Sequence, residues 1–469
     1  MSSDTIKAVV VGGGLAGLAA GIKLLEQRPG AKVTLYTLGH HLGGKATSYR
    51  DADGFHIDHG FHALSTNYHR LLGLLARSGV DKSKTLMLDR GTYYYDDRTG
   101  KIAKSGTVAD LLRPDTLKTL SFFNKNAGLI YKEPEIEPFD DICWTAWAVQ
   151  HGLEEELTKT RSFRFSRDAL FNWPHEVSAY ITLKSLRLLG GSVQYYLVDG
   201  TYGEDIIEPI VNRFRKLGGT IQLFHKLTEV LHEGRRVTEL RFAIPDFTFH
   251  NHGRTKWERA VRVLPERTAT ITDFDHVILA VPVDNFRELN SGDRAFWTGF
   301  AGVENLQTVA TLSLQVWTEQ CVLPGVSACI NTLDEPLPMV IDYKDLKSRY
   351  RNDDRLGSAV EWVGQETSFE HLSDEELKAT AYDCLARIPG AEDPRQAGMI
   401  HESLNRNTSN HERYLLTDPG TLKFRPRPKT AFRNLFLAGD WIRNEVDVPT
   451  MEGAVCSGYT AVAELLKGL

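Results

Sequence analysis

Three glycines near the amino terminus have the spacing of residues that bind a phosphate group. They are Gly12, Gly14 and Gly17, and they directly follow an apolar run. In such a turn the first glycine permits a sharp change of direction, the second lets the backbone approach a pyrophosphate, and the third lets a helix pack closely on a strand. Free N–H groups at the start of that helix attract the anion. The spacing therefore predicts a dinucleotide-binding turn.

The segments around this turn have the order that the chemistry requires. Residues 6–11 predict a buried strand, residues 15–27 a helix and residues 32–36 a second strand, which is the first unit of a Rossmann-type fold. Such units carry an acidic residue after the second strand to bind the ribose, but here Thr37 stands there. A hydroxyl can still contact the ribose without a charge. An uncharged residue also tolerates a 2′-phosphate, although no arginine adjoins Thr37 to bind one.

Two longer segments make the match specific. Residues 37–45 end in Gly-Gly-Lys, and residues 55–62 read Phe-His-Ile-Asp-His-Gly-Phe-His. Together they resemble the amine oxidase and carotenoid desaturase superfamily of FAD enzymes. In that family a Gly-Gly-Arg motif contacts the FAD phosphates, and an Asp-x-Gly-x-His stretch lies beside the isoalloxazine. The chain departs from the pattern at Thr37, where the family has glutamate, and at Lys45, which keeps the charge of the usual arginine but not its bidentate geometry.

Further segments resemble the same family in the expected order. Residues 434–440 form an apolar run ending in Gly-Asp, and residues 449–454 read Pro-Thr-Met-Glu-Gly-Ala and open a helix. In the family the positive end of this helix faces the flavin, where it stabilises negative charge. Residues 198–230 resemble the segment that clamps the adenine through the backbone, here at Leu227, and residues 274–282 resemble a strand that returns to the FAD domain.

The resemblance implies FAD as the cofactor and a set of residues that hold it. That set is Gly12, Gly14, Leu15, Ala16, Gly17, Thr37, Gly43, Gly44, Lys45, Gly60, Phe61, Leu227, Gly439, Asp440, Met451 and Ala454. His62 is our candidate for a catalytic polar group beside the flavin, with His59 as the alternative. Asp58 is as well suited to hold the backbone as to act as a base.

The fold class that follows is α/β, with a Rossmann-type FAD-binding domain and an interleaved α+β substrate domain of mixed sheet and helices. We expect the first domain to comprise residues 1–62, 196–282 and 426–469, and the second residues 63–195 and 283–425. The substrate domain is predicted to hold helices at 68–78, 108–112, 117–127, 141–149, 153–160 and 178–189, and a strand at 308–317. Residues 246–267 predict a surface insertion and residues 345–355 a charged, solvated loop.

Aromatic residues are concentrated in and beside the helical stretch. They include Tyr93, Tyr94, Tyr95, Phe122, Phe123, Trp144, Trp147, Phe163, Phe165, Phe171, Trp173, Tyr195 and Tyr196. We expect most of them in an ordinary core, although as a group they would suit a long apolar tunnel. Residues 111–112 and 117–129 mix leucines with lysines and would suit either a packed surface helix or a membrane surface.

Composition excludes several other classes of protein. The 469 residues are 42% hydrophobic and 25% charged, which is ordinary for a folded chain, and the length suggests two or three domains. The net charge of −6 offers no positive field for a polyanion, so we expect no nucleic-acid partner. Five scattered cysteines form no Cys-x-x-Cys pair, so we expect neither a metal site nor a disulfide framework. A cytoplasmic protein fits best, with peripheral membrane association left open, because no apolar run is long enough to span a bilayer.

The loop at residues 440–449 bears on the substrate class. It lacks the Trp-Ser-Gly-Tyr motif of monoamine oxidases, and with residues 451–458 it looks more like plant-type phytoene and ζ-carotene desaturases and hydroxysqualene dehydroxylase. This implies hydride transfer from a C–H bond of a long apolar isoprenoid to flavin N5, with a quinone or oxygen as the final acceptor. Two alternatives stay open. One is an amine or amino-acid oxidase whose aromatic cage uses Trp441, and the other is a non-catalytic binding protein, which Thr37 motivates.

Overall fold

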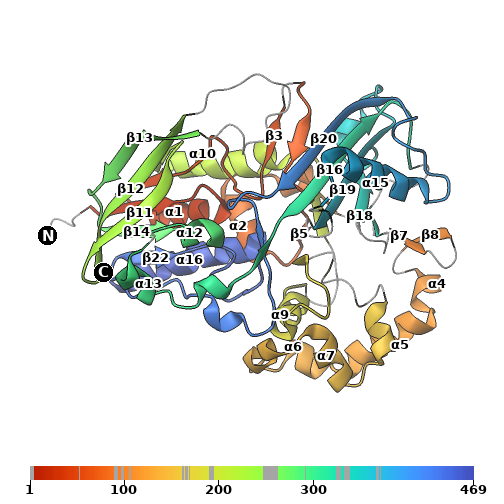
Figure 1. The fold of residues 1–469 in the computed structure, drawn as a ribbon, viewed down its shortest axis with the longest axis horizontal. Coiled ribbons are helices and arrows are strands. Elements are labelled where there is room, and N and C mark those ends of the chain that lie inside the picture. Colours follow the sequence, from red (N-terminus) through yellow and green to blue (C-terminus); the bar gives the residue numbers. More distant parts are fainter. Residues whose placement is uncertain are drawn as a thin grey trace.

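A computed structural model of the chain describes residues 5–51, 53–88, 93–96, 100–104, 107–160, 163, 167, 170–189, 195–246, 262–290, 292–323, 329–331, 339–365, 369 and 371–469. The predicted α/β class is confirmed, since a parallel sheet with helices lies beside a larger mixed sheet (Figure 1). A third region, made of helices, lies below the mixed sheet in the same view.

Five parallel strands carry the glycine-rich turn. In spatial order they are β10 (Thr220–Gln222), β2 (Lys32–Tyr36), β1 (Lys7–Val11), β14 (His276–Leu279) and β22 (Leu435–Leu437). Side chains alternate across such a sheet, so Val10 and Ile278 belong to the core formed with helices α1 (Leu15–Gln27) and α16 (Met451–Lys467). Val9 and Leu279 belong to a second core on the other face.

The second face is covered by an antiparallel sheet and two short helices. The sheet comprises β11 (Lys226–Glu233), β12 (Arg236–Asp246) and β13 (Arg262–Ile271), and the helices are α12 (Val283–Arg287) and α13 (Arg294–Thr298). Residues 247–261 of the predicted insertion lie outside the described residues. At the ends of this predicted insertion, Asp246 belongs to β12 and residues 262–267 belong to β13.

Helices α1 and α16 approach each other closely behind the parallel sheet. A Cβ atom at Gly458 would lie 2.4 Å from the carbonyl oxygen of Ala16, which only glycine avoids. The predicted helix over 15–27 is confirmed to the residue. Another helix begins as a π-helical turn, Tyr202–Ile207, and continues as α10 (Glu208–Lys216). Its Phe214 ring lies where a Cβ at Gly21 would be, 2.6 Å from one ring carbon.

The larger sheet has seven strands and is mixed. Their order is β20 (Met399–Asn407), β16 (Thr311–Thr318), β19 (Ser358–Gln365), β18 (Met339–Asp342), β17 (Cys329–Asn331), β7 (Tyr93–Asp96) and β8 (Lys101–Lys104). Leu314 and Trp362 pack with helix α15 (Asp374–Ala386) on one face. Trp317 and Ile341 pack with Ile57 on the other face. The sheet therefore lies directly against the segment that carries the predicted catalytic histidine.

Smaller elements connect these layers. They are β3 (Ser48–Arg50), β4 (His56–Asp58), β5 (Leu64–Ser65), α2 (His69–Arg77), α3 (Lys82–Thr85), β6 (Leu86–Leu88), β9 (Tyr195–Val198), β15 (Thr308–Val309), α14 (Ser348–Arg351) and β21 (Tyr414–Leu415). Strands β15 and β16 replace the single strand predicted over 308–317. The solvated loop predicted over 345–355 is wrong in part, because it contains α14, and Leu346, Lys347 and Tyr350 are buried.

The helical region has its own core. Its elements are α4 (Val108–Leu111), α5 (Pro114–Lys125), α6 (Ala127–Tyr131), α7 (Trp144–Gln150), the 3-10 turn Glu155–Lys159 and α9 (Ala179–Leu189). Trp144 stacks on Trp147 with ring centroids 5.0 Å apart, and on Phe163 at 5.3 Å. All three are fully buried, so they form packed core, as expected for most of the aromatic set. Phe165 lies outside the described residues.

Candidate functional site

The glycine turn between β1 and α1 has the shape of a phosphate cradle. A Cβ at Gly12 would lie 2.2 Å from the carbonyl oxygen of Ala280, and one at Gly17 would lie 2.0 Å from that of Gly12. At Gly14 the nearest atom, the Cα of Gly44, would be 3.9 Å away, so the backbone is open at that position. Helix α1 begins at Gly14 with no side-chain cap. Its first N–H groups are therefore available to an anion, and these features fit the pyrophosphate of FAD.

The second glycine pair lies beside this turn. The Gly43 N–H donates to the Gly13 carbonyl at 2.8 Å. Lys45 follows the glycine pair, and its Nζ lies 2.9 Å from Asp440 Oδ2. Two residues that sequence reasoning selected from opposite ends of the chain thus meet as an ion pair. Both side chains stay partly exposed, so the pair is accessible to a third charged group such as a phosphate.

Thr37 lies beside the turn, as its place after β2 predicted. It is buried, and its Oγ1 would be 2.7 Å from a Cβ on Gly13. Its carbonyl accepts a hydrogen bond from the His225 N–H at 2.9 Å, which draws the start of β11, including Leu227, to the same edge. The structure therefore brings together Thr37 and Leu227, the residues predicted to contact the ribose and the adenine.

Two neighbouring side chains at the amino end of α16 cap different helices. Thr450 caps the helix by accepting from the Gly453 N–H at 3.1 Å. The Glu452 carboxylate accepts from the backbone N–H groups of Arg70 and Leu71, both at 2.8 Å, and so caps helix α2 instead. Met451 and Ala454 stay half-buried at this end. Sequence reasoning missed Glu452 because its partners lie far away along the chain.

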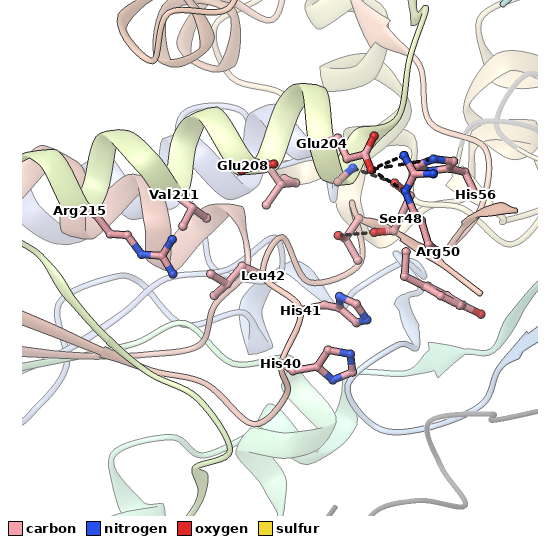
Figure 2. A pocket seen from close by; sticks show the side chains of 14 residues that line it. His40, His41, Leu42, Ser48, Arg50, His56, Glu204, Glu208, Val211 and Arg215 are labelled. Atoms are coloured by element: carbon pink, nitrogen blue, oxygen red, sulfur yellow. Dashed lines mark hydrogen bonds and ion pairs between the residues drawn. The ribbon is translucent and has the colours of Figure 1, made fainter. Parts of the chain in front are cut away.

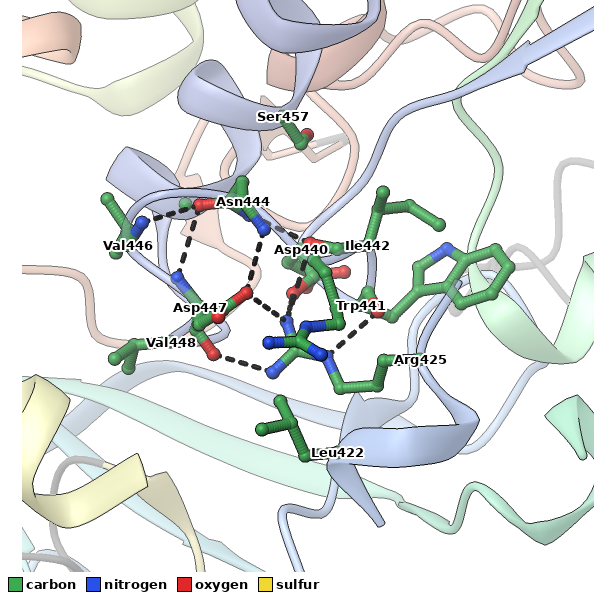
Figure 3. Close-up of polar contacts among 12 residues, drawn as sticks. Leu422, Arg425, Asp440, Trp441, Ile442, Asn444, Val446, Asp447, Val448 and Ser457 are labelled. Carbon is green, nitrogen blue, oxygen red and sulfur yellow. Dashed lines mark hydrogen bonds and ion pairs between the residues drawn. The ribbon is translucent and has the colours of Figure 1, made fainter. Parts of the chain in front are cut away.

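Arg425 holds the loop between β22 and α16 (Figure 3). It is buried, and its guanidinium donates to the carbonyl oxygens of Trp441 at 3.0 Å, Asp447 at 2.6 Å and Asp440 at 3.2 Å. Asp447 has φ 59°, a left-handed conformation that is uncommon outside glycine and that aspartate tolerates better than most residue types. No sequence motif singled out Arg425, because its role depends on a loop that begins fifteen residues later.

The Asp58–His62 segment begins at the end of β4 and lies against the mixed sheet. His62 Nδ1 donates to the Gly60 carbonyl at 2.7 Å, which leaves the lone pair of the neutral ring on Nε2. Burial lowers the pKa of His62, so the ring is neutral at pH 7. The Tyr202 hydroxyl donates to the His62 carbonyl at 2.7 Å. A neutral imidazole with an acceptor nitrogen can accept a hydrogen bond, which fits the polar group predicted at His62.

Amide side chains of the mixed sheet hold the backbone of this segment. Gln315 donates to the Asp58 carbonyl at 3.0 Å, Asn405 donates to the same oxygen at 3.3 Å, and Asn407 donates to the His59 carbonyl at 3.0 Å. Burial lowers the pKa of His59 to about 3, so this ring is neutral as well. The sheet therefore positions the candidate site through polar contacts that sequence reasoning did not foresee.

A separate pocket of about 330 Å³ lies between helix α10 and the loop that precedes β3 (Figure 2). His40, His41, Arg50 and Glu204 are among its lining residues, and Arg50 pairs with Glu204 at 2.9 Å. Burial lowers the pKa of His41 to about 4. None of the residues implied for FAD is among those that line this pocket.

Comparison with known proteins fits this geometry. Residues 15–466 match the family described as flavin containing amine oxidoreductase, and the chain belongs to that family. A 15-cis-phytoene desaturase of Synechococcus elongatus is 25% identical over 97% of this chain and 94% of its own length. A zeta-carotene desaturase of Synechocystis is 23% identical, covering 98% and 97%.

Solved structures of the same fold cover nearly the whole chain. A putrescine oxidase bound to putrescine matches with a TM-score of 0.71 at 16% identity, over 99% of this chain and 100% of its own. Cyclohexylamine oxidase from Brevibacterium oxydans matches at 0.70 and 15%, over 99% of both chains. At these identities the likeness concerns the fold.

The protein is therefore an FAD-dependent oxidoreductase of the amine oxidase and carotenoid desaturase family. Bound FAD supplies an acceptor for two electrons from a substrate C–H bond. The non-catalytic alternative that Thr37 motivated has no support from the comparisons. The structure brings Gly43 beside the glycine turn and Lys45 beside Asp440, and the contacts of the predicted residues with FAD stay predictions.

Proposed function

We propose that the protein oxidises a long apolar isoprenoid of the carotenoid or squalene type. The observation that carries this proposal is the likeness to phytoene and zeta-carotene desaturases, which extends over nearly the whole of both chains. In this proposal His62 and the Gly60–Phe61 backbone lie beside the flavin, and Lys45 with Asp440 and the α1 amino end bind its phosphates. The chain's task is to place the reacting carbon and to exclude water.

The amine oxidase alternative required Trp441 to form part of an aromatic substrate cage. Trp441 is buried, and its indole N–H donates to the Val281 carbonyl at 2.9 Å. Its ring packs against Phe286 with centroids 5.3 Å apart. This residue belongs to a core, where it cannot form part of a substrate cage.

An exposed apolar surface supports the proposal that the substrate arrives from a lipid bilayer. On α4, α5 and the turn between them, Val108 is 73% exposed, Leu112 64% and Leu117 46%, and Leu111 and Leu120 are also exposed. Two of the cations on these elements are paired, Arg113 with Asp115 and Lys118 with Glu154. We infer that this face contacts the bilayer surface through apolar side chains, with little need for anionic lipid. Among the described residues no helix is long and apolar enough to cross a membrane.

The substrate proposal is tested with purified holoenzyme and detergent- or vesicle-dispersed phytoene, ζ-carotene and squalene-type substrates. We expect anaerobic bleaching of the flavin by an isoprenoid, with the product identified by its absorption and mass. Reoxidation by a quinone or by oxygen then identifies the acceptor. Bleaching by primary amines, with peroxide release and none by isoprenoids, would overturn the proposal.

The membrane proposal is tested by flotation with zwitterionic phosphatidylcholine vesicles. A Leu112→Asp/Leu117→Asp double variant should lose most vesicle binding, because two exposed apolar side chains become charged. Leu469→Asp, at an equally exposed leucine at the chain's end, is the matched control and should float like the wild type. Binding that requires anionic lipid, or that survives the double variant, would contradict an apolar contact.

A further inference from the structure

Two carboxylates and one ammonium group are buried together behind the Asp58–His62 segment. Asp58 lies on β4, Lys347 immediately before α14 and Glu361 on β19. Their exposures are 8%, 5% and 1%, and Lys347 Nζ lies 3.3 Å from Asp58 Oδ2. Burial of charges is costly unless they are paired, so a third charged group here requires an explanation.

Glu361 is connected to the candidate site by hydrogen bonds. Its carboxylate accepts from Tyr343 at 2.6 Å, from Ser313 at 2.7 Å and from Gln315 Nε2 at 3.4 Å. The Gln315 amide in turn donates to the Asp58 carbonyl at 3.0 Å and accepts from the Asp58 N–H at 3.4 Å. A change of charge at Glu361 is therefore transmitted to the peptide of Asp58.

Burial and neighbouring charges shift the pKa values of Glu361 and Lys347. Burial and then the Asp58 charge raise the pKa of Glu361 to about 7, although Tyr343, Ser313 and Lys347 act against the rise. Burial alone would lower the pKa of Lys347, but the facing Asp58 and Glu361 carboxylates and the Tyr350 hydroxyl raise it on balance, so this side chain stays charged.

Other titratable groups also face the carboxylates. Burial raises the pKa of Tyr202 and Tyr350 and lowers the pKa of His56 and His62, so these four side chains are neutral at pH 7, and Tyr343 donates to Glu361. Loss of the Glu361 proton therefore adds one negative charge to the cluster.

We propose that Glu361 is a positioning residue of the flavin site, which takes up a proton from solvent when negative charge arrives on the flavin and releases it on reoxidation. The proton forms an O–H bond on the Glu361 carboxylate, and no electron moves to or from the cluster. Gln315 and Lys347 pass the effect to the Asp58–His62 segment. The inference rests on the proposed place of the flavin beside that segment, and it does not depend on the substrate.

The test is a spectroelectrochemical titration of the flavin in the holoenzyme from about pH 5 to about pH 9. Proton uptake per flavin reduced is obtained from the slope of midpoint potential against pH. In the wild type we expect an additional proton to be taken up around neutral pH. The Glu361→Gln variant keeps the shape of the side chain but cannot titrate, so this additional uptake should disappear.

Asp342→Asn is the matched control. Asp342 is equally buried on the neighbouring strand, but it pairs in register with Val360 and so lies on the opposite face of the sheet. Its variant should keep the wild-type slope. Equal proton uptake in the wild type and Glu361→Gln, or an equal loss in both variants, would overturn the inference.

A milder variant covers the case in which Glu361→Gln does not fold. Tyr343→Phe removes a hydrogen bond that stabilises the ionised carboxylate, so the additional uptake should move to higher pH. An unmoved transition would contradict the proposal. A holoenzyme that shows these shifts but turns over no isoprenoid would contradict the proposed substrate and leave the role of Glu361 intact.

Discussion

At the scale of single residues, Thr37 is the clearest departure from the family pattern. It lies beside Gly13 at the turn, where the family has a glutamate for the ribose hydroxyls. A charged hydrogen bond contributes roughly 1.5–3 kcal/mol. Thr37→Glu should therefore tighten FAD binding by about tenfold or more, measured by fluorescence titration of the apoprotein. Thr37→Gln has the same length without the charge and should gain less. Unchanged affinity in Thr37→Glu would remove Thr37 from the ribose site.

Glu361 should also affect stability through its proton. Its pKa is raised from 4.5 to about 7 in the folded state, so the unfolded chain loses this proton first as pH rises. The unfolding free energy should then fall between about pH 4.5 and about pH 7, by on the order of 3 kcal/mol from this group. Urea unfolding of the wild type and Glu361→Gln across this range measures the difference. Parallel pH profiles would show that Glu361 does not titrate there.

Residue types alone could predict the glycine turn, because Gly12, Gly14 and Gly17 are required by local backbone geometry. They could not predict the state of Lys347. A lysine in a charged run is normally solvated, and this one is buried only because Asp58, 289 residues away, supplies its partner. The position of Thr37 could likewise be predicted from a local motif. The position of Glu361 could not, because it depends on the register of the strands in the mixed sheet.

At the scale of elements, the sequence could predict most helices and strands of the parallel sheet. Helix α1 was predicted to the residue because an apolar period, a glycine start and a Pro-Gly stop agree. The helical region is harder, since Trp144 and Trp147 fit either a tunnel or a core until their partners are known. The seven-stranded order of the mixed sheet depends on pairing between distant segments, which no local pattern specifies.

Arg425 contributes several buried hydrogen bonds to the loop between β22 and α16. Arg425→Met would leave the Trp441, Asp440 and Asp447 carbonyls without their donor and the Asp447 carboxylate without its cation. Removing one partner of such a buried set costs about 3 kcal/mol or more, so the urea midpoint should fall sharply and FAD should dissociate more readily.

Arg443→Met is the matched control on the same loop. The Arg443 side chain is 15% exposed and its partner Glu137 is 59% exposed, so its replacement should cost less stability than that of the fully buried Arg425. If both variants lose equal stability, the loop does not depend on the carbonyl contacts of Arg425 in particular.

At the scale of the whole molecule, the residues implied for FAD come from the beginning, the middle and the end of the chain. Gly14 and Lys45 lie near the amino terminus, Leu227 near the middle and Asp440 near the carboxyl terminus, yet Gly14 lies beside Gly44 and Lys45 pairs with Asp440. A ligand that contacts all of them can bind only when these segments are assembled. FAD should therefore stabilise the complete fold, and local stabilisation of one unit is not expected.

This argument predicts a dependence on cofactor concentration. A ligand that binds only the native state adds about 2.7 kcal/mol at one hundred times its dissociation constant. Thermal unfolding of the apoprotein with increasing FAD should therefore show one transition that moves steadily upward. Lys45→Met should require more FAD for the same shift, because Asp440 would lose its partner and the phosphates a cation, whereas Lys45→Arg should need no more than the wild type. Two transitions, of which only one responds to FAD, would show that the cofactor stabilises a single part of the chain.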